Sequence, residues 1–183
     1  MEDIRGNLAK VRATLKEGVQ LIAVTKTHSY QEINTAIDAG VTDIGENKVQ
    51  EILDKYDHVK PVRWHMIGHL QTNKVKYIID KVALIHSVDS LKLAKEIDKR
   101  AKQHDLMMEI LIQVNAAHEE SKFGVDESET ETLIREILDQ CGNVRICGLM
   151  TVAPFAENPE EIRQYFAEVR KQYDRRPDRK SVV

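Results

Sequence analysis

The sequence has only two cysteines, Cys141 and Cys147, in 183 residues. Two cysteines are too few for a disulfide-based scaffold, and reduced thiols in a cytoplasmic protein are the simplest interpretation. Aromatic residues are also scarce, at 5%, whereas apolar residues make up 42% and charged residues 31% of the chain. These proportions are typical of a globular protein with one domain and a substantial core, and they exclude a disordered chain.

Long apolar runs and a strong net charge are absent as well. No run approaches the roughly 20 residues that a membrane-spanning helix requires. Residues 1–6 do not combine a basic flank with an apolar stretch, so we predict no secretory signal. The net charge of −3 gives no electrostatic reason to expect nucleic acid. We therefore expect a cytoplasmic protein whose partners include neither a membrane nor a nucleic acid.

Helical and strand-like hydrophobic patterns alternate along the chain. Apolar residues between 4 and 15 recur at helical spacing, and 21–24 is a short aliphatic run expected of a strand buried on both faces. Gly40, Ser90, Gly142 and Pro159 are typical start or stop signals for the helices beside them. Further strands are predicted at 41–45, 62–67, 82–87, 109–115 and 145–150, and helices at 30–39, 47–57, 72–81, 91–104, 131–141 and 160–173.

An initial helix followed by six strand–helix units predicts an α/β fold with a parallel sheet. A (β/α) barrel uses about 250 residues for eight units, so this length suits about six of them. The alternative is an open, doubly wound sheet, but no Gly-x-Gly-x-x-Gly follows a predicted strand and no Walker-type loop is present. Residues 174–183 are polar, basic and unpatterned, and we predict a disordered tail there.

Lys26 directly follows the first aliphatic run. Ligands of α/β proteins gather at the carboxyl ends of strands, and a lysine there can present its amine to a pocket. A desolvated lysine with a lowered pKa can form a Schiff base. Most lysines are surface charges, however, so position alone does not decide between the two roles.

Other polar residues stand near predicted strand ends. Asn47 could contact a ligand, cap a helix at its N-terminus, or do both. His65 and His69 are four residues apart, but Gly68 indicates a strand and loop rather than a metal-binding helix, so packing and loop hydrogen bonds are preferred over zinc. Ser87 and Asn115 either contact a ligand or terminate their strands by bonding loop amides. Met150 either contacts a ligand or packs in the core.

Three segments of the chain are distinctive in their order: Leu-Ile-Ala-Val-Thr-Lys at 21–26, Gly-Glu-Asn-Lys-Val-Gln-Glu at 45–51 and Trp-His-Met-Ile-Gly-His-Leu-Gln-Thr-Asn-Lys at 64–74. Together they resemble the pyridoxal phosphate homeostasis protein family, which is related to the barrel domain of alanine racemase. The resemblance extends to about residue 173. It implies a TIM-barrel type of fold, a role in vitamin B6 homeostasis without catalysis, and pyridoxal 5′-phosphate (PLP) held as a Schiff base on Lys26. The cofactor contacts that it implies or that lie at matching strand ends are Asn47, His65, Ser87, Asn115 and Met150.

Members of that family continue with two further strand–helix units, which carry a Ser-Gly-Met-Ser-type loop and an Arg-Ile-Gly-type turn that hold the phosphate. Neither motif occurs here. We therefore expect an incomplete barrel over 1–173, with open sheet edges and weak retention of PLP. The alternatives are a PLP-dependent amino-acid racemase and a truncated form with little PLP binding. Expected partners are PLP and PLP-dependent apoenzymes, and the expected state is a monomer or weak oligomer.

Overall fold

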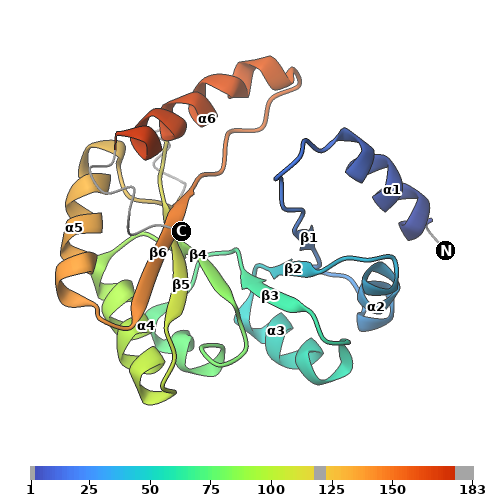
Figure 1. Ribbon diagram of the computed structural model, residues 1–183, viewed down its shortest axis with the longest axis horizontal. Coiled ribbons are helices and arrows are strands. Elements are labelled where there is room, and N and C mark those ends of the chain that lie inside the picture. The colour runs from blue at the N-terminus through green and yellow to red at the C-terminus, as the bar shows by residue number, and fades with distance from the viewer. Residues whose placement is uncertain (1–2, 118–122, 176–183) are drawn as a thin grey trace.

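A curved parallel sheet forms the centre of the molecule (Figure 1). A computed structural model describes residues 3–117 and 123–175. The sheet has six strands in the order β1-β2-β3-β4-β5-β6, and every neighbouring pair is parallel. The strands are β1 (Ala23–Val24), β2 (Asp43–Glu46), β3 (Arg63–Met66), β4 (Leu84–Val88), β5 (Met108–Gln113) and β6 (Val144–Met150).

This strictly sequential order decides between the two predicted architectures. A doubly wound sheet reverses its strand order at a switch point, whereas a (β/α) barrel adds each strand beside the previous one. The predicted parallel α/β fold of the barrel type is therefore confirmed. Within the described residues β1 pairs only with β2, and β6 pairs only with β5.

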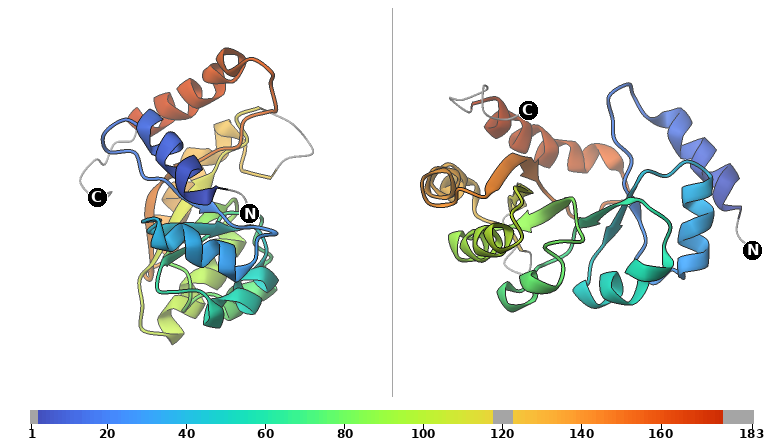
Figure 2. Two further views of the ribbon diagram at one scale, coloured as in Figure 1. Left: turned by 90° about the vertical axis from the view of Figure 1, so that its right-hand side faces the viewer. Right: turned by 60° about the horizontal axis from the view of Figure 1, so that its bottom comes forward.

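Helices follow the strands and cover the outer side of the curved sheet (Figures 1 and 2). Helices α1 and α6 lie at opposite ends of it. Three short 3-10 helices complete the described elements: η1 (Tyr56–His58), η2 (Thr72–Tyr77) and η3 (Glu127–Glu129). The α-helices are α1 (Ile4–Thr14), α2 (Tyr30–Asp38), α3 (Val49–Lys55), α4 (Leu91–Gln103), α5 (Thr130–Gln140) and α6 (Pro159–Asp174).

The predicted helix signals act as expected. Ser90 accepts a hydrogen bond from the Leu93 amide at the start of α4. Gly40, just past α2, has φ of 90°, a conformation that glycine adopts without steric cost. Pro159 occupies the first turn of α6, where its missing N–H costs nothing.

The core lies between the sheet and the outer helices. Ile44, Ile85 and Ile110 enter it from the strands, and all are 0% exposed. Helix α4 contributes four buried residues, including Ile97, whereas α6 contributes none. Packing is therefore dense around the middle of the sheet and sparse at its β6 end.

Two sequence predictions are wrong in their details. The first strand is not buried on both faces, because Val24 is 49% exposed. The physical reason is that β1 has a strand neighbour on one side only among the described residues. The predicted α-helix at 72–81 is instead the 3-10 helix η2, with the Ile78 amide bonded to the Val75 carbonyl three residues back. Val75, Ile78 and Ile79 remain buried, and short 3-10 turns are common connectors.

Helix α6 ends at Asp174, so the predicted tail at 174–183 begins as helix. Residues 176–183 lie outside the described residues. No helix in the described ranges is both long and apolar enough to cross a membrane.

Candidate functional site

The carboxyl ends of the parallel strands meet at one edge of the sheet, which we call the carboxyl edge. Five of the six predicted site residues lie at or near this edge, each at the end of a different strand. They are Lys26 after β1, Asn47 after β2, Ser87 near the end of β4, Asn115 after β5 and Met150 at the end of β6. The fold therefore brings together residues that are up to 124 positions apart in the sequence.

Lys26 is exposed and makes no ion pair with a described residue. Its two neighbours are held firmly. Thr25 is 4% exposed, and its amide bonds the Gly45 carbonyl of β2. Thr27 has φ of 67°, an uncommon conformation for a non-glycine residue that persists only where surrounding contacts fix it.

A partly buried ion network supplies those contacts. The Nζ atom of Lys55, on α3, donates to the Thr25 carbonyl at 2.9 Å, to Glu46 Oε1 at 2.7 Å and to Glu51 Oε2 at 2.8 Å. The Thr25 hydroxyl donates to Glu46 Oε1 at 2.8 Å. We call Thr25, Glu46, Glu51 and Lys55 the Lys55 clamp.

The clamp reaches both sides of Lys26. The Thr27 amide donates to Glu51 Oε2 at 2.8 Å, so Thr25 and Thr27 are each tied to a carboxylate bound by Lys55. Burial disfavours the Lys55 ammonium, but the hydrogen bonds that it donates to two carboxylates outweigh that effect and raise the pKa of Lys55. The hydrogen bond from Lys55 likewise lowers the pKa of Glu51. Lys55 and Glu51 are therefore charged at neutral pH.

Asn47 lies where β2 and β3 approach closely. A side chain on Gly68 would lie 2.7 Å from the Asn47 Cα, so the close approach requires glycine there. The alternative role of Asn47 as a helix cap is wrong, because Lys48 occupies the N-cap position of α3 and makes no side-chain cap bond. Asn47 is half-buried at the carboxyl edge, which leaves its side chain available for a ligand.

His65 differs from the other predicted residues, because it lies inside β3 and is 2% exposed. Its Nε2 atom is 2.8 Å from Asp43 Oδ1 on β2, and its Nδ1 atom is 2.9 Å from Nε2 of His86 on β4. Both ring nitrogens are therefore engaged within the sheet. A direct contact of His65 with a cofactor stays a prediction. Neither ring nitrogen of His65 is left unbonded to make such a contact.

Burial keeps the two imidazoles neutral at pH 7. Burial, followed by the charge of His65, lowers the pKa of His86 from 6.5 to about 4. Burial also lowers the pKa of His65, although the Asp43 carboxylate acts in the opposite direction. Sequence reasoning missed Asp43 and His86, and the available signal was the presence of polar residues inside three neighbouring predicted strands.

Ser87 is 0% exposed, and its Oγ atom has no hydrogen-bond partner among the described residues. Its alternative role, bonding loop amides to terminate a strand, therefore finds no support. Buried polar atoms are normally paired, so an unpaired hydroxyl near the carboxyl edge marks a position where a ligand atom could bind. Asn115 and Met150 are half-buried, and their main chains bond Val125 and Val114 respectively.

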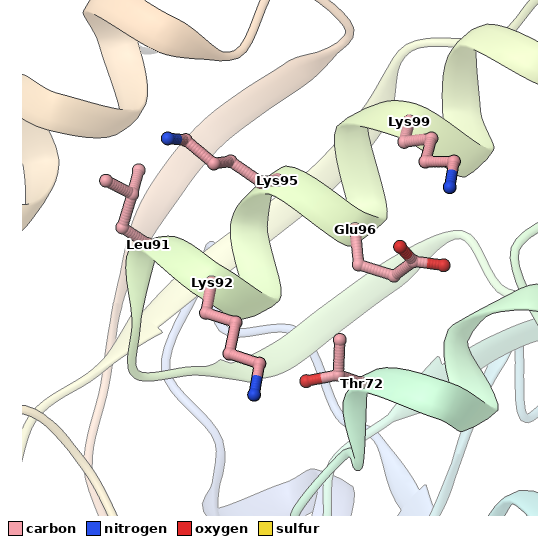
Figure 3. A pocket seen from close by; sticks show the side chains of 6 residues that line it. All are labelled: Thr72, Leu91, Lys92, Lys95, Glu96 and Lys99. Carbon is pink, nitrogen blue, oxygen red and sulfur yellow. The ribbon is translucent and has the colours of Figure 1, made fainter.

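His69 is not near a metal-ligand cluster. Its ring stacks on Phe123 with centroids 3.9 Å apart. No group of three or more His, Cys, Asp or Glu residues within 3–117 and 123–175 could hold a metal ion. A separate groove of about 550 Å³ lies on the outer layer, and none of the predicted site residues lines it (Figure 3). Its lining residues are Thr72, Leu91, Lys92, Lys95, Glu96 and Lys99.

Comparisons with known proteins agree with the fold. The family model described as alanine racemase, N-terminal domain, matches residues 1–182. The chain is 43% identical over 157 residues to the pyridoxal phosphate homeostasis protein of Aquifex aeolicus, covering 85% of this chain and 68% of the relative.

Solved structures show the same fold. PipY of Synechococcus elongatus, solved with PLP bound, is 32% identical and has a TM-score of 0.79, covering 94% of this chain and 84% of PipY. Alanine racemase of Clostridium difficile has a TM-score of 0.78 over 94% of this chain and 47% of the racemase, but it is only 14% identical. This last similarity concerns the fold alone.

Proposed function

This chain belongs to the pyridoxal phosphate homeostasis protein family, within the wider family of the alanine racemase N-terminal domain, and we propose that it binds PLP through Lys26. PLP supplies an aldehyde that condenses with a primary amine to give a Schiff base. The role we propose is to hold and release PLP within the cell, as part of vitamin B6 homeostasis.

The observation that carries this proposal is the setting of Lys26. Its amine is exposed at the carboxyl edge, while the residues on both sides of it are fixed by the Lys55 clamp. A fixed backbone reduces the entropy lost when a ligand binds to the side chain it carries. Asn47, Ser87, Asn115 and Met150 lie along the same edge and are the proposed further contacts of the cofactor.

We further propose that the protein does not catalyse amino-acid chemistry. A PLP enzyme needs acid and base groups placed beside the reacting atoms. Both ring nitrogens of His65 are bonded within the sheet, to Asp43 and to His86, so His65 offers no free base to a substrate. The relative from Aquifex aeolicus is named a homeostasis protein, which supports the same conclusion.

An absorbance titration with PLP tests the binding proposal. We expect the wild type to shift the absorbance band of PLP, and Lys26→Ala to abolish that shift. Lys48→Ala is the matched control, because Lys48 is an exposed lysine close to the same edge. An equal shift in the wild type and Lys26→Ala would contradict the proposal. Alanine racemisation that depends on Lys26 would contradict the non-catalytic role.

PLP-dependent apoenzymes are the proposed recipients, and the cytoplasm is the proposed location. The test is to mix the PLP-loaded protein with an apo-aminotransferase and follow recovery of the transferase activity. We expect recovery without prior release of PLP to bulk solution, so an added PLP scavenger should not prevent it. Sedimentation of the same sample tests the proposed monomer or weak oligomer.

A further inference from the structure

Asp43, His65 and His86 form a continuous hydrogen-bonded chain across three neighbouring strands, β2, β3 and β4. The contacts are 2.8 Å between Asp43 Oδ1 and His65 Nε2, and 2.9 Å between His65 Nδ1 and His86 Nε2. All three residues are at most 8% exposed. Nothing in the proposed binding of PLP by Lys26 requires such a chain.

The ionisation state of Asp43, at one end of the hydrogen-bonded chain, determines which ring nitrogens of His65 and His86 carry protons. Asp43 accepts bonds from the Gln20 amide at 2.6 Å and the Thr42 hydroxyl at 2.7 Å. Burial acts to raise the pKa of Asp43, but the hydrogen bonds from Thr42 and His65 and the charge of Arg63 lower it overall, so its carboxylate is ionised. An ionised carboxylate only accepts, so His65 must carry its proton on Nε2. In a neutral His65 the Nδ1 atom is then an acceptor, which requires a proton on Nε2 of His86.

The same logic leaves Nδ1 of His86 without a proton. This atom has no hydrogen-bond partner among the described residues, and His86 remains 8% exposed. The adjacent Ser87 hydroxyl, fully buried, is also unpaired within those residues. Both residues therefore carry a polar atom without a partner in the described part of the chain, and His86 is the one of the two with exposed surface.

We propose that Asp43, His65 and His86 form a one-proton relay, which accepts a proton from an N–H or O–H donor of a bound small molecule at Nδ1 of His86. As that proton binds, the proton on Nε2 of His86 passes to Nδ1 of His65. His86 stays neutral in its other tautomer, and His65 becomes an imidazolium beside the Asp43 carboxylate. One proton enters, and the donor loses one.

The charge settles on His65 because that ring contacts a carboxylate, as the imidazolium of a catalytic triad does. The charged groups around it are Asp43 from β2, Arg63 from β3 and Glu109 from β5. Glu109 is itself bound by Arg145 of β6. His86 faces the charge of His65 alone, so it is the poorer place for a positive charge. In its resting state the relay therefore offers a hydrogen-bond acceptor, Nδ1 of His86, to a ligand.

Histidine NMR tests the relay on the free protein. In the ¹⁵N-labelled wild type at pH 7, we expect His65 and His86 to be neutral with their protons on Nε2, assigned with His65→Gln and His86→Gln. On acidification, His65 should become doubly protonated first, while the remaining neutral signal of His86 switches from the Nε2–H to the Nδ1–H tautomer. A proton on Nδ1 of His86 at pH 7, or double protonation of His86 before His65, would overturn the relay.

Asp43→Asn is the decisive variant, because it keeps an oxygen acceptor and removes the charge. We expect the midpoint of His65 protonation to fall in Asp43→Asn and to stay unchanged in Asp57→Asn, an exposed control. An unchanged midpoint in Asp43→Asn would overturn the proposal even if every other variant failed to fold.

PLP serves as the ligand probe, and the experiment with added PLP is the only one of these tests that rests on the proposed function. We expect added PLP to change the Nδ1 signal of His86 in the wild type. A shift of the PLP absorbance band with an unchanged His86 signal would overturn the ligand role of the relay and leave PLP binding intact. If PLP fails to bind, the proposed function fails, and the spectra of the free protein still decide the relay.

Discussion

Two regions of the molecule use the same kinds of charged side chain in opposite ways. Between β1, β2 and α3, Lys55 is 12% exposed and Glu46 is 0% exposed, and their ion pair fixes the backbone beside Lys26. On α6, Lys171 is 61% exposed and pairs with Glu168, which is 34% exposed. Helix α6 also buries none of its residues, whereas α3 buries Val49 and Ile52.

The comparison shows that the contribution of an ion pair to stability depends on how deeply the pair is buried. Exposed pairs are screened by water and contribute little. A buried charge that loses its partner is costly, because the charge that remains is left without solvent. The structure is therefore most sensitive to change around the proposed lysine and least sensitive along α6.

The largest difference is expected when one lysine is removed from each region. Lys55→Met should destabilise the fold by roughly 3–5 kcal/mol, because Glu46 and Glu51 lose the ammonium that they share. Lys171→Met should unfold at the same denaturant concentration as the wild type. Urea unfolding followed by circular dichroism measures both. Equal midpoints for the two variants would remove the distinction between the regions.

The buried imidazoles should make stability depend on pH, whereas exposed histidines should not. His86 has a pKa of about 4 in the folded protein and 6.5 when unfolded. The unfolded chain therefore binds the proton first, and stability falls as pH drops from about 6.5 towards 4. Since one pKa unit is worth about 1.4 kcal/mol, the full loss is about 3 kcal/mol.

Replacing His86 should remove most of that dependence. His86→Gln keeps a donor towards His65, and its stability should fall less steeply between pH 6.5 and 4 than that of the wild type. His104→Gln, an exposed control, should follow the wild-type curve. Urea unfolding at a series of pH values measures the slopes. A wild-type slope in His86→Gln would show that other groups cause the acid sensitivity.

A smaller difference is expected for two threonines at the carboxyl edge. Thr25 donates to the buried Glu46 carboxylate at 2.8 Å, and Thr151 donates to the Val114 carbonyl at 2.9 Å. Thr25→Val should cost roughly 1.5–3 kcal/mol, because it removes a bond to a charged group, and Thr151→Val roughly 0.5–1.5 kcal/mol. Thermal unfolding ranks them, and a larger loss in Thr151→Val would reverse the comparison.

Much of the fold could be predicted because its signals are local. Aliphatic runs such as 109–115 and 145–150 indicated buried strands, and Ser90 and Pro159 marked helix starts that the structure confirms. The exposure of Val24 could not be predicted, because it depends on which strands lie beside β1. The 3-10 form of η2 differs from an α-helix in hydrogen bonding and not in its apolar pattern.

The candidate site also contains residues with a local sequence signal and residues without one. Lys26 and Asn47 could be found from their places after apolar runs and from a family resemblance. The Lys55 clamp could not, because Lys55 and Thr25 are 30 residues apart. Only the Glu51–Lys55 pair, at a helical spacing of four, left a local signal. Weak retention of PLP stays a prediction, and dialysis of the loaded 183-residue chain tests it.

The central claim is that Lys26 binds PLP from a backbone fixed by the Lys55 clamp. The most direct test is borohydride reduction of the PLP-treated protein, followed by peptide mapping of the pyridoxyl label in the wild type. We predict that the label lies on Lys26, and that exposed lysines such as Lys48 and Lys171 carry only background amounts. Label concentrated on another lysine, with Lys26 unmodified, would contradict the account.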